Sequence, residues 1–214
     1  MGFIVGNNDK PFIKVCGIKD SETAEFLFSL SLNAVGFISY KKSPRYISAG
    51  ELKKLLRNID CIEKEKVGVF VNEDLDTVKE YMDAGITVAQ LHGDETKNFA
   101  EQCRSIGLKV WKVLRPRIES DIDRYIDYPA EFFLIDAFKR GVPGGTGEQV
   151  NRELAIYCVE RLPLPVILAG GINPENAFGI YQDIRPFGLD VNSGVEISPG
   201  LKDKEKIIRL LDLW

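Results

Sequence analysis

The stretch FIKVCGIKDSETAEFLFSLSL, residues 12–32, contains the repeating unit from which the fold of this chain is predicted. Its first part, FIKVCGI, is short, apolar and rich in β-branched residues, as is typical of a buried strand. In its second part Asp20 or Ser21 can cap a helix, a glutamate stands in the first turn, and apolar residues recur along one helical face. The stretch therefore predicts a strand that leads through a short loop into a helix.

The same strand-and-helix pattern recurs along the whole chain. Strands are predicted at residues 12–18, 34–39, 66–71, 87–93, 109–115, 132–138, 165–171 and 189–195. Helices are predicted between the strands. The helical pattern is weaker at about 119–126 and 151–161 than elsewhere. One helix is expected to begin with Asn173 as its cap and Pro174 at its first position, and two others to stop at Gly85 and Gly107.

Eight strand–helix pairs in one domain favour a closed (β/α)8 TIM barrel, an α/β fold. An open doubly wound sheet is the alternative, but it usually has fewer strands, and the G-x-G-x-x-G turn that often follows its first strand is absent here. The barrel is assigned to residues 12–214 as a single catalytic domain, and residues 1–11 are predicted to be an N-terminal extension.

Composition excludes several classes of protein. The 214 residues carry a formal charge of -4 and the pI is near 5.3, which argues against a globally basic binder of nucleic acid or of anionic membranes. No signal peptide is expected from the N-terminal residues, and no apolar stretch is long enough to span a bilayer. The cysteines, Cys16, Cys61, Cys103 and Cys158, form no C-x-x-C pair, so neither structural zinc nor a disulfide framework is expected. We therefore expect a cytoplasmic protein.

Glycine-bearing segments follow three consecutive strands late in the chain. They are GVPGGTG (141–147), LAGGINPEN (168–176) and VNSGVE (191–196). Glycines let the backbone approach an anion closely, and helix N-termini present free N–H groups. A phosphate site after strands seven and eight recurs in this barrel. Three such segments at one rim favour a phosphate site over loops that need glycine only to turn.

Titratable side chains stand at the same predicted rim. Cys16 ends the first strand, Asp136 the sixth, and Asp190 lies near the end of the eighth, while Arg45 follows the second strand beside a proline. Taken singly, each fits a structural role, as does the single histidine, His92. Because the carboxyl ends of barrel strands carry the chemistry, their shared placement favours an acid–base site with Arg45 as a two-pronged clamp for a carboxylate.

Motifs distributed in order through nearly the whole chain resemble the phosphoribosylanthranilate isomerase family. They are KVCGI, GFISYKKSPRYIS, VGVFVN, QLHGDE, LIDAFKRGVPGGTG, ILAGGINPEN and GLDVNSGVE. The resemblance implies an Amadori rearrangement of N-(5-phosphoribosyl)anthranilate, a small phosphosugar substrate, in tryptophan biosynthesis. It implies no metal and no organic cofactor.

The resemblance also implies roles for individual residues. Cys16 would be the general base, Asp136 the general acid, and Arg45 the partner of the anthranilate carboxylate. The backbone around Gly145, Gly170, Gly171, Ser193 and Gly194 would hold the phosphate, and Asp190 would support the site. Lys14 lies two residues before Cys16 and hence on the same side of the strand, so we hypothesise that it favours the thiolate. Gly17 is expected to keep bulk away from the thiol.

The chain departs from the family pattern at three places, and two alternatives stay open. EQVNREL follows GGTG where Phe-Asp-Trp is common, Asn192 stands where serine is common, and residues precede the usual start. One alternative is a broader isomerase that also accepts the related aminoaldose of histidine biosynthesis, although no second anion site is evident in the first half. The other is a barrel that binds phosphate without turnover.

The surface helices lack a long apolar face, so a monomer is expected.

Overall fold

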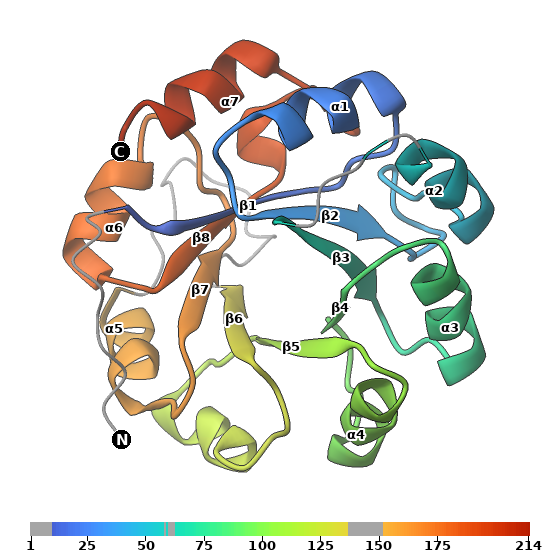
Figure 1. Cartoon of the computed structure of the whole chain (residues 1–214). Helices are drawn as coiled ribbons and strands as arrows, with labels where there is room; N and C mark the ends of the chain where they lie inside the picture. The colour runs from blue at the N-terminus through green and yellow to red at the C-terminus, as the bar shows by residue number, and fades with distance from the viewer. Residues whose placement is uncertain (1–9, 58, 60–62, 137–151) are drawn as a thin grey trace.

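The computed structural model describes residues 10–57, 59, 63–136 and 152–214. Eight parallel strands form a closed barrel in the order β1 to β8, and helices surround it (Figure 1). The strands are β1 (Phe12–Cys16), β2 (Ala34–Ile38), β3 (Glu65–Phe70), β4 (Val88–Leu91), β5 (Lys109–Leu114), β6 (Phe132–Asp136), β7 (Val166–Ala169) and β8 (Gly188–Val191). The predicted (β/α)8 barrel is confirmed.

Side-chain caps begin most of the helices. Asp20, Ser48, Asp74 and Thr96 each accept a hydrogen bond from a backbone N–H in the first turn of the helix that follows. The helices are α1 (Ser21–Ser29), α2 (Ala49–Leu56), α3 (Leu75–Asp83), α4 (Lys97–Ser105), α5 (Arg152–Arg161), α6 (Ala177–Ile184) and α7 (Lys204–Leu211). Gly85 and Gly107 follow α3 and α4 with φ of 111° and 101°, so the predicted glycine stops are confirmed.

Several boundaries differ from the prediction. The segment between β5 and β6 is a 3-10 helix, η1 (Glu119–Tyr125). Helix α6 begins at Ala177, not after Asn173, because Asn173 Oδ1 accepts from the N–H groups of Glu175 and Asn176 and closes a separate turn. Strand β4 ends at Leu91 and β8 at Val191, so both are shorter than predicted.

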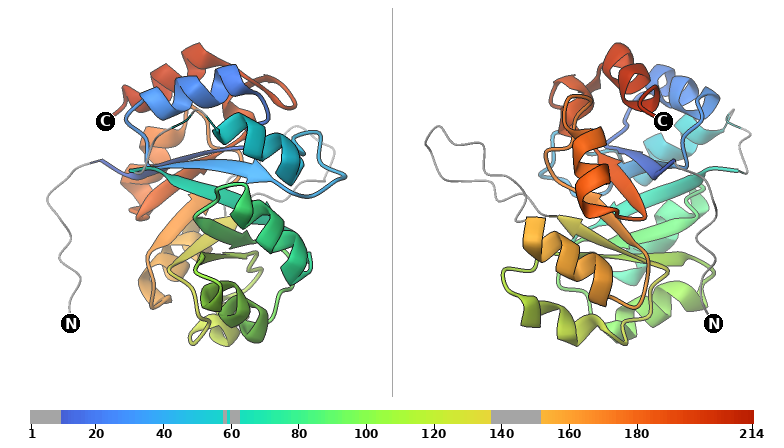
Figure 2. Two further views of the ribbon diagram at one scale, coloured as in Figure 1. Left: turned by 45° about the vertical axis from the view of Figure 1, so that its right-hand side comes forward. Right: turned by 90° about the vertical axis from the view of Figure 1, so that its left-hand side faces the viewer.

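A small hairpin outside the barrel was not predicted. A 3-10 turn, η2 (Ser193–Val195), leads from β8 into antiparallel strands β9 (Glu196–Ser198) and β10 (Leu201–Lys202), which precede α7. Helices α7 and α1 lie side by side where β8 closes on β1 (Figures 1 and 2). Lys204 of α7 pairs with Glu22 of α1 at 2.6 Å. The hairpin thus stands beside the ends of the first and last strands.

Aromatic side chains fill the N-terminal end of the barrel. Phe12, Trp111, Phe132 and Phe187 contact one another with ring-centroid distances between 5.0 and 5.8 Å. Gly188 makes room for this cluster, because a Cβ there would lie 2.4 Å from the carbonyl oxygen of Phe12. This end of the barrel is therefore a packed plug.

Most of the predicted N-terminal extension lies outside the described residues. So do Cys61 and the whole GVPGGTG segment, including Gly145. Within the described part of the chain, no helix combines the length and apolar character needed to span a bilayer.

Candidate active site

Cys16 is the last residue of β1, and its side chain points into the barrel. It is 4% exposed and belongs to the cluster of side chains that fills the barrel interior. Two residues earlier, Lys14 is fully buried on the same side and donates to both carboxylate oxygens of Asp190 at 2.9 Å. The strand pairing of Lys14 with Asp190 across β1 and β8 makes this contact possible. Asp190 therefore holds Lys14 beneath the thiol.

Gly36 on β2 provides the space that the thiol and the ammonium occupy. A Cβ at Gly36 would lie 2.6 Å from Cys16 Sγ and 3.1 Å from Lys14 Nζ. Cys16 Sγ and Lys14 Nζ therefore both lie close to Gly36 of β2. Any larger residue at position 36 would displace the thiol, so this glycine belongs to the site.

Burial and charge act in opposite directions on Cys16. Burial raises the pKa of the thiol above its ordinary value; Lys14 lowers it and Asp190 raises it by smaller amounts. This effect of Lys14 has the direction that the hypothesis requires, but burial outweighs it. Desolvation opposes the charge on Lys14, yet the pKa of Lys14 is raised because Asp190 and Cys16 attract its ammonium. Burial thus favours the protonated thiol, and the adjacent Lys14 favours the thiolate.

Arg45 lies at the same rim but is already engaged by a carboxylate. Its Nε donates to Glu196 Oε1 at 2.8 Å and its Nη2 to Oε2 at 2.6 Å. Lys202 Nζ donates to the same Oε1 at 2.9 Å. The exposed fractions of the three side chains are 11% for Arg45, 4% for Glu196 and 1% for Lys202. Glu196 therefore lies buried between two cations.

Gly17 provides space for the side chains of Arg45 and Asn192. Its φ is +82°, and a Cβ there would lie 2.7 Å from Arg45 Cδ and 2.8 Å from Asn192 Oδ1. The glycine thus lets the stem of Arg45 cross directly over the residue that follows Cys16. Asn192, one of the departures from the family pattern, accepts from Lys202 Nζ through Oδ1 at 2.9 Å and through its carbonyl at 3.0 Å.

Asp136 ends β6 with a half-buried carboxylate. His92 Nε2 and Arg115 Nε each lie 3.8 Å from its Oδ2. His92 follows β4, and a buried network fixes the loop that carries it. Glu95 accepts from the N–H of Gly93 at 3.0 Å, and Lys112 donates to Glu95 at 2.9 Å. His92, expected to serve structure, is thereby brought to the rim beside Asp136.

The two described glycine segments meet at the carboxyl ends of β7 and β8. Gly170 and Gly171 have φ of 96° and 59°, which favours glycine at both positions. A Cβ at Gly194 would lie 1.9 Å from the carbonyl oxygen of Ile172, so η2 packs directly on the loop after β7. The N–H groups of Gly171, Ser193 and Gly194 donate to no acceptor within the described residues. They remain available to an anion.

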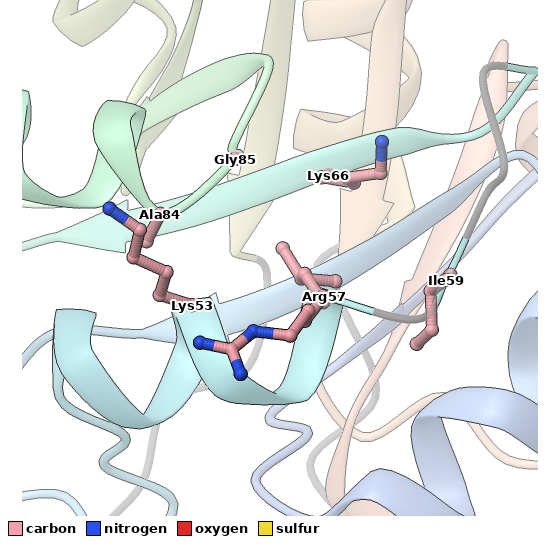
Figure 3. A pocket seen from close by; sticks show the side chains of 7 residues that line it. Lys53, Arg57, Ile59, Lys66, Ala84 and Gly85 are labelled. Atoms are coloured by element: carbon pink, nitrogen blue, oxygen red, sulfur yellow. The ribbon is translucent and has the colours of Figure 1, made fainter.

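A shallow hollow of about 260 Å³ lies at the opposite end of the barrel. Lys53, Arg57 and Lys66 line it with Leu56, Ile59, Ala84 and Gly85 (Figure 3). These residues belong to the ends of α2 and α3 and the start of β3, whereas the side chains described above stand at the strands' carboxyl ends. The hollow is separate from the candidate site.

Sequence reasoning named eight described candidates at one rim and missed several of their partners. The eight are Cys16, Arg45, Asp136, Gly170, Gly171, Asp190, Ser193 and Gly194. Cys16 and Asp190 both lie beside Lys14. Gly170, Gly171 and Gly194 belong to loops that pack against each other. Gly36, Glu196 and Lys202 were missed, although Glu196 ends the quoted VNSGVE segment. Buried charges seldom occur without a partner, so Lys202 and Glu196 would have been candidates once their burial was known.

Comparison with known proteins connects this arrangement to one family. Residues 13–212 match the model of the N-(5'-phosphoribosyl)anthranilate (PRA) isomerase family. The N-(5'-phosphoribosyl)anthranilate isomerase of Syntrophus aciditrophicus is 40% identical over 201 residues, which cover 93% of this chain and 85% of that protein.

Solved structures agree with this match. A monomer generated from the dimeric phosphoribosylanthranilate isomerase of Thermotoga maritima has a TM-score of 0.81 and 30% identity, covering 95% of this chain and 98% of that one. A phosphoribosyl anthranilate isomerase in complex with reduced 1-(o-carboxyphenylamino)-1-deoxyribulose 5-phosphate has a TM-score of 0.77 and 32% identity, covering 95% and 97%.

Proposed function

This chain belongs to the N-(5'-phosphoribosyl)anthranilate isomerase family and is an isomerase of tryptophan biosynthesis, and we propose that Cys16 and Asp136 carry out its chemistry. The substrate of the proposed reaction is N-(5-phosphoribosyl)anthranilate, and the product is 1-(2-carboxyphenylamino)-1-deoxyribulose 5-phosphate. The observation that carries the proposal is the presence of both side chains on inward positions at one rim. The strand register relates these positions. Asp136 of β6 pairs with Ala169 of β7, Ala169 pairs with Asp190 of β8, and Asp190 pairs with Lys14, which lies two residues before Cys16 on β1.

The first step opens the ribose ring. Asp136 donates a proton to the ring oxygen, the bond from C1 to that oxygen breaks, and the anthranilate nitrogen forms an iminium with C1. The loop after β4 holds His92 close to the Asp136 carboxylate, and Arg115 approaches it from β5. An acid presented at the barrel mouth suits a substrate that enters from the loop side.

The second step removes the proton from C2. Cys16, as thiolate, takes this proton, and the electron pair moves into the bond between C1 and C2 while the iminium nitrogen becomes neutral. The enolamine then gains a proton at C1 and loses one from the C2 hydroxyl, which gives the ketone. Because burial raises the pKa of the Cys16 thiol, the cationic iminium beside it is what favours the thiolate, together with Lys14.

Two groups of residues are assigned to substrate binding, one for the phosphate and one for the carboxylate. We assign the phosphate to the free N–H groups of Gly171, Ser193 and Gly194, beside Gly170, with Gly145 contributing from outside the described residues. We assign the anthranilate carboxylate to Arg45, whose stem crosses over Gly17 next to the thiol. Asp190 supports the base by holding Lys14 in place.

The experiment measures turnover of N-(5-phosphoribosyl)anthranilate by the wild type, Cys16→Ser and Asp136→Asn. Each variant should lose about 10²- to 10⁴-fold in kcat, the usual contribution of one general acid or base. Cys158→Ser changes a buried thiol of α5, and Asp76→Asn an exposed carboxylate of α3; both are matched controls and should retain activity. Full activity in both site variants would refute the assignment, and no turnover by the wild type would favour the phosphate-binding alternative.

The assembly and location of the protein are also proposed. We propose a cytoplasmic monomer, although the related enzyme of Thermotoga maritima is dimeric. Sedimentation equilibrium would distinguish the 24.0 kDa monomer from a dimer. A mass near twice that value would refute the monomer.

A further inference from the structure

The engagement of Arg45 by Glu196 determines which edge of the guanidinium faces the ligand. A guanidinium carries five N–H donors in a planar fork. Glu196 occupies the edge formed by Nε and one N–H of Nη2. Both N–H groups of Nη1 and the second of Nη2 have no acceptor within the described residues. The remaining edge therefore presents a second fork that matches another carboxylate.

Glu196 itself has no freedom to turn. Its Oε1 accepts from Arg45 Nε, from Lys202 Nζ and from the N–H of Gly200 at 3.2 Å, and its Oε2 accepts from Arg45 Nη2. Lys202 is also held by both oxygens of Asn192, at the end of β8. The hairpin β9–β10 thus links the guanidinium rigidly to the barrel.

The charges of the cluster formed by Arg45, Glu196 and Lys202 explain why Lys202 is present as a second cation. A buried carboxylate that pairs with Arg45 alone would cancel the arginine's charge and leave little attraction for an anion. Lys202 adds one positive charge, so Arg45, Glu196 and Lys202 together carry a net charge of +1. The neighbouring Lys14–Asp190 pair contributes none. One carboxylate of a ligand would neutralise the cluster.

We infer that Glu196 and Lys202 are positioning residues that orient Arg45 and preserve its charge for the substrate carboxylate. Glu196 directs the free edge of the guanidinium, and Lys202 offsets the charge of Glu196. This inference rests on the proposed function, in which Arg45 binds the anthranilate carboxylate. It assigns to the β9–β10 hairpin a specificity for carboxylated aryl amines.

The test compares two ligands in each variant by isothermal titration calorimetry. One is reduced 1-(o-carboxyphenylamino)-1-deoxyribulose 5-phosphate, and the other is the same compound without the ring carboxylate. The wild type should prefer the carboxylated ligand by at least about tenfold, as expected for hydrogen bonds to a charged group. Glu196→Gln raises the net charge of the cluster but frees the guanidinium to turn. It should therefore lose most of this preference, while the affinity for the second ligand stays within about twofold. With the natural substrate, KM should rise more than kcat falls.

Further variants separate the possible outcomes. Arg45→Met should abolish the preference, and Arg45→Met with Glu196→Gln should be no worse than Arg45→Met alone. If Arg45→Met retained the preference, the proposed carboxylate clamp would be wrong, whatever Glu196 does. If Arg45→Met lost it and Glu196→Gln kept it, only the positioning role would be refuted.

A structural role for Glu196 predicts a different result, namely an equal loss of affinity for both ligands. Lys202→Met provides a second measurement if Glu196→Gln does not fold. It leaves the contact between Glu196 and Arg45 in place but removes the added charge, so the preference should fall about tenfold; an unchanged preference, or an equal loss for both ligands, would overturn the inference. Glu22→Gln, at the exposed pair with Lys204, is the matched control and should behave as the wild type.

Discussion

The two ends of the barrel are built from opposite kinds of side chain. At the N-terminal end, Phe12, Trp111, Phe132 and Phe187 pack into an apolar plug. At the C-terminal end, Lys14, Asp190, Arg45, Glu196 and Lys202 form buried ion pairs around a thiol. Apolar burial stabilises a fold, whereas buried ion pairs contribute little net stability and are costly to break. The plug should therefore supply stability, and the charged end should supply function.

Replacing Trp111 with alanine should have the largest effect on stability. The side chain is fully buried within the plug, and removing a buried aromatic of this size usually costs about 3–5 kcal/mol. Chemical denaturation measures this loss, and kcat of the folded fraction should stay close to that of the wild type. A large fall in kcat at unchanged stability would show that the two ends are not separate in role.

Lys14→Met tests whether the charged end also affects stability. The change leaves the carboxylate of Asp190 buried without its partner, which usually costs about 3 kcal/mol or more. Adding Asp190→Asn removes the unpaired charge, so the double variant should regain most of the lost free energy of unfolding but not the activity. Equal stability of the single and double variants would contradict this account.

A pair of glycine variants compares the two ends directly. Gly36→Ala forces a Cβ to within 2.6 Å of Cys16 Sγ, and Gly188→Ala forces one to within 2.4 Å of the Phe12 carbonyl. Each overpacked site should lose about 1–3 kcal/mol. Only Gly36→Ala should also lower kcat, by about tenfold, because it displaces the thiol. Steady-state kinetics beside thermal unfolding checks this; equal kcat values for the two variants would be inconsistent with it.

The smallest expected effect concerns the reactivity of Cys16 towards iodoacetamide. The thiolate is the reacting species, and burial raises the pKa of this thiol, so less thiolate is present at pH 7 than in a free cysteine. Alkylation of the Cys16 peptide, followed by mass spectrometry, should be slower than that of glutathione at pH 7 and should accelerate as the pH rises. Faster alkylation than glutathione at pH 7 would mean that the pKa is lowered instead.

Local pattern was enough to predict the repeating strand–helix unit and the rim where the candidate site lies. The strand at 12–16, the cap Asp20 and the stops at Gly85 and Gly107 depend on neighbours within a few residues. The placement of Cys16 and Asp136 at strand ends follows from the same pattern, since all strands of such a barrel run in one direction. The late start of α6 was missed because Asn173 can cap a helix or a separate turn, and the sequence allows both.

Only the tertiary structure decided which charged residues form pairs. Lys14 and Asp190 are 176 residues apart in sequence, and Arg45 and Glu196 are 151 apart. No periodicity links such pairs, because closure of β8 on β1 brings them together. The sequence by itself determined a (β/α)8 barrel with a thiol, carboxylates and an arginine at one rim. Barrel closure alone determined that one edge of the Arg45 guanidinium is bound by Glu196, because the hairpin brings Glu196 to Arg45 from far along the sequence.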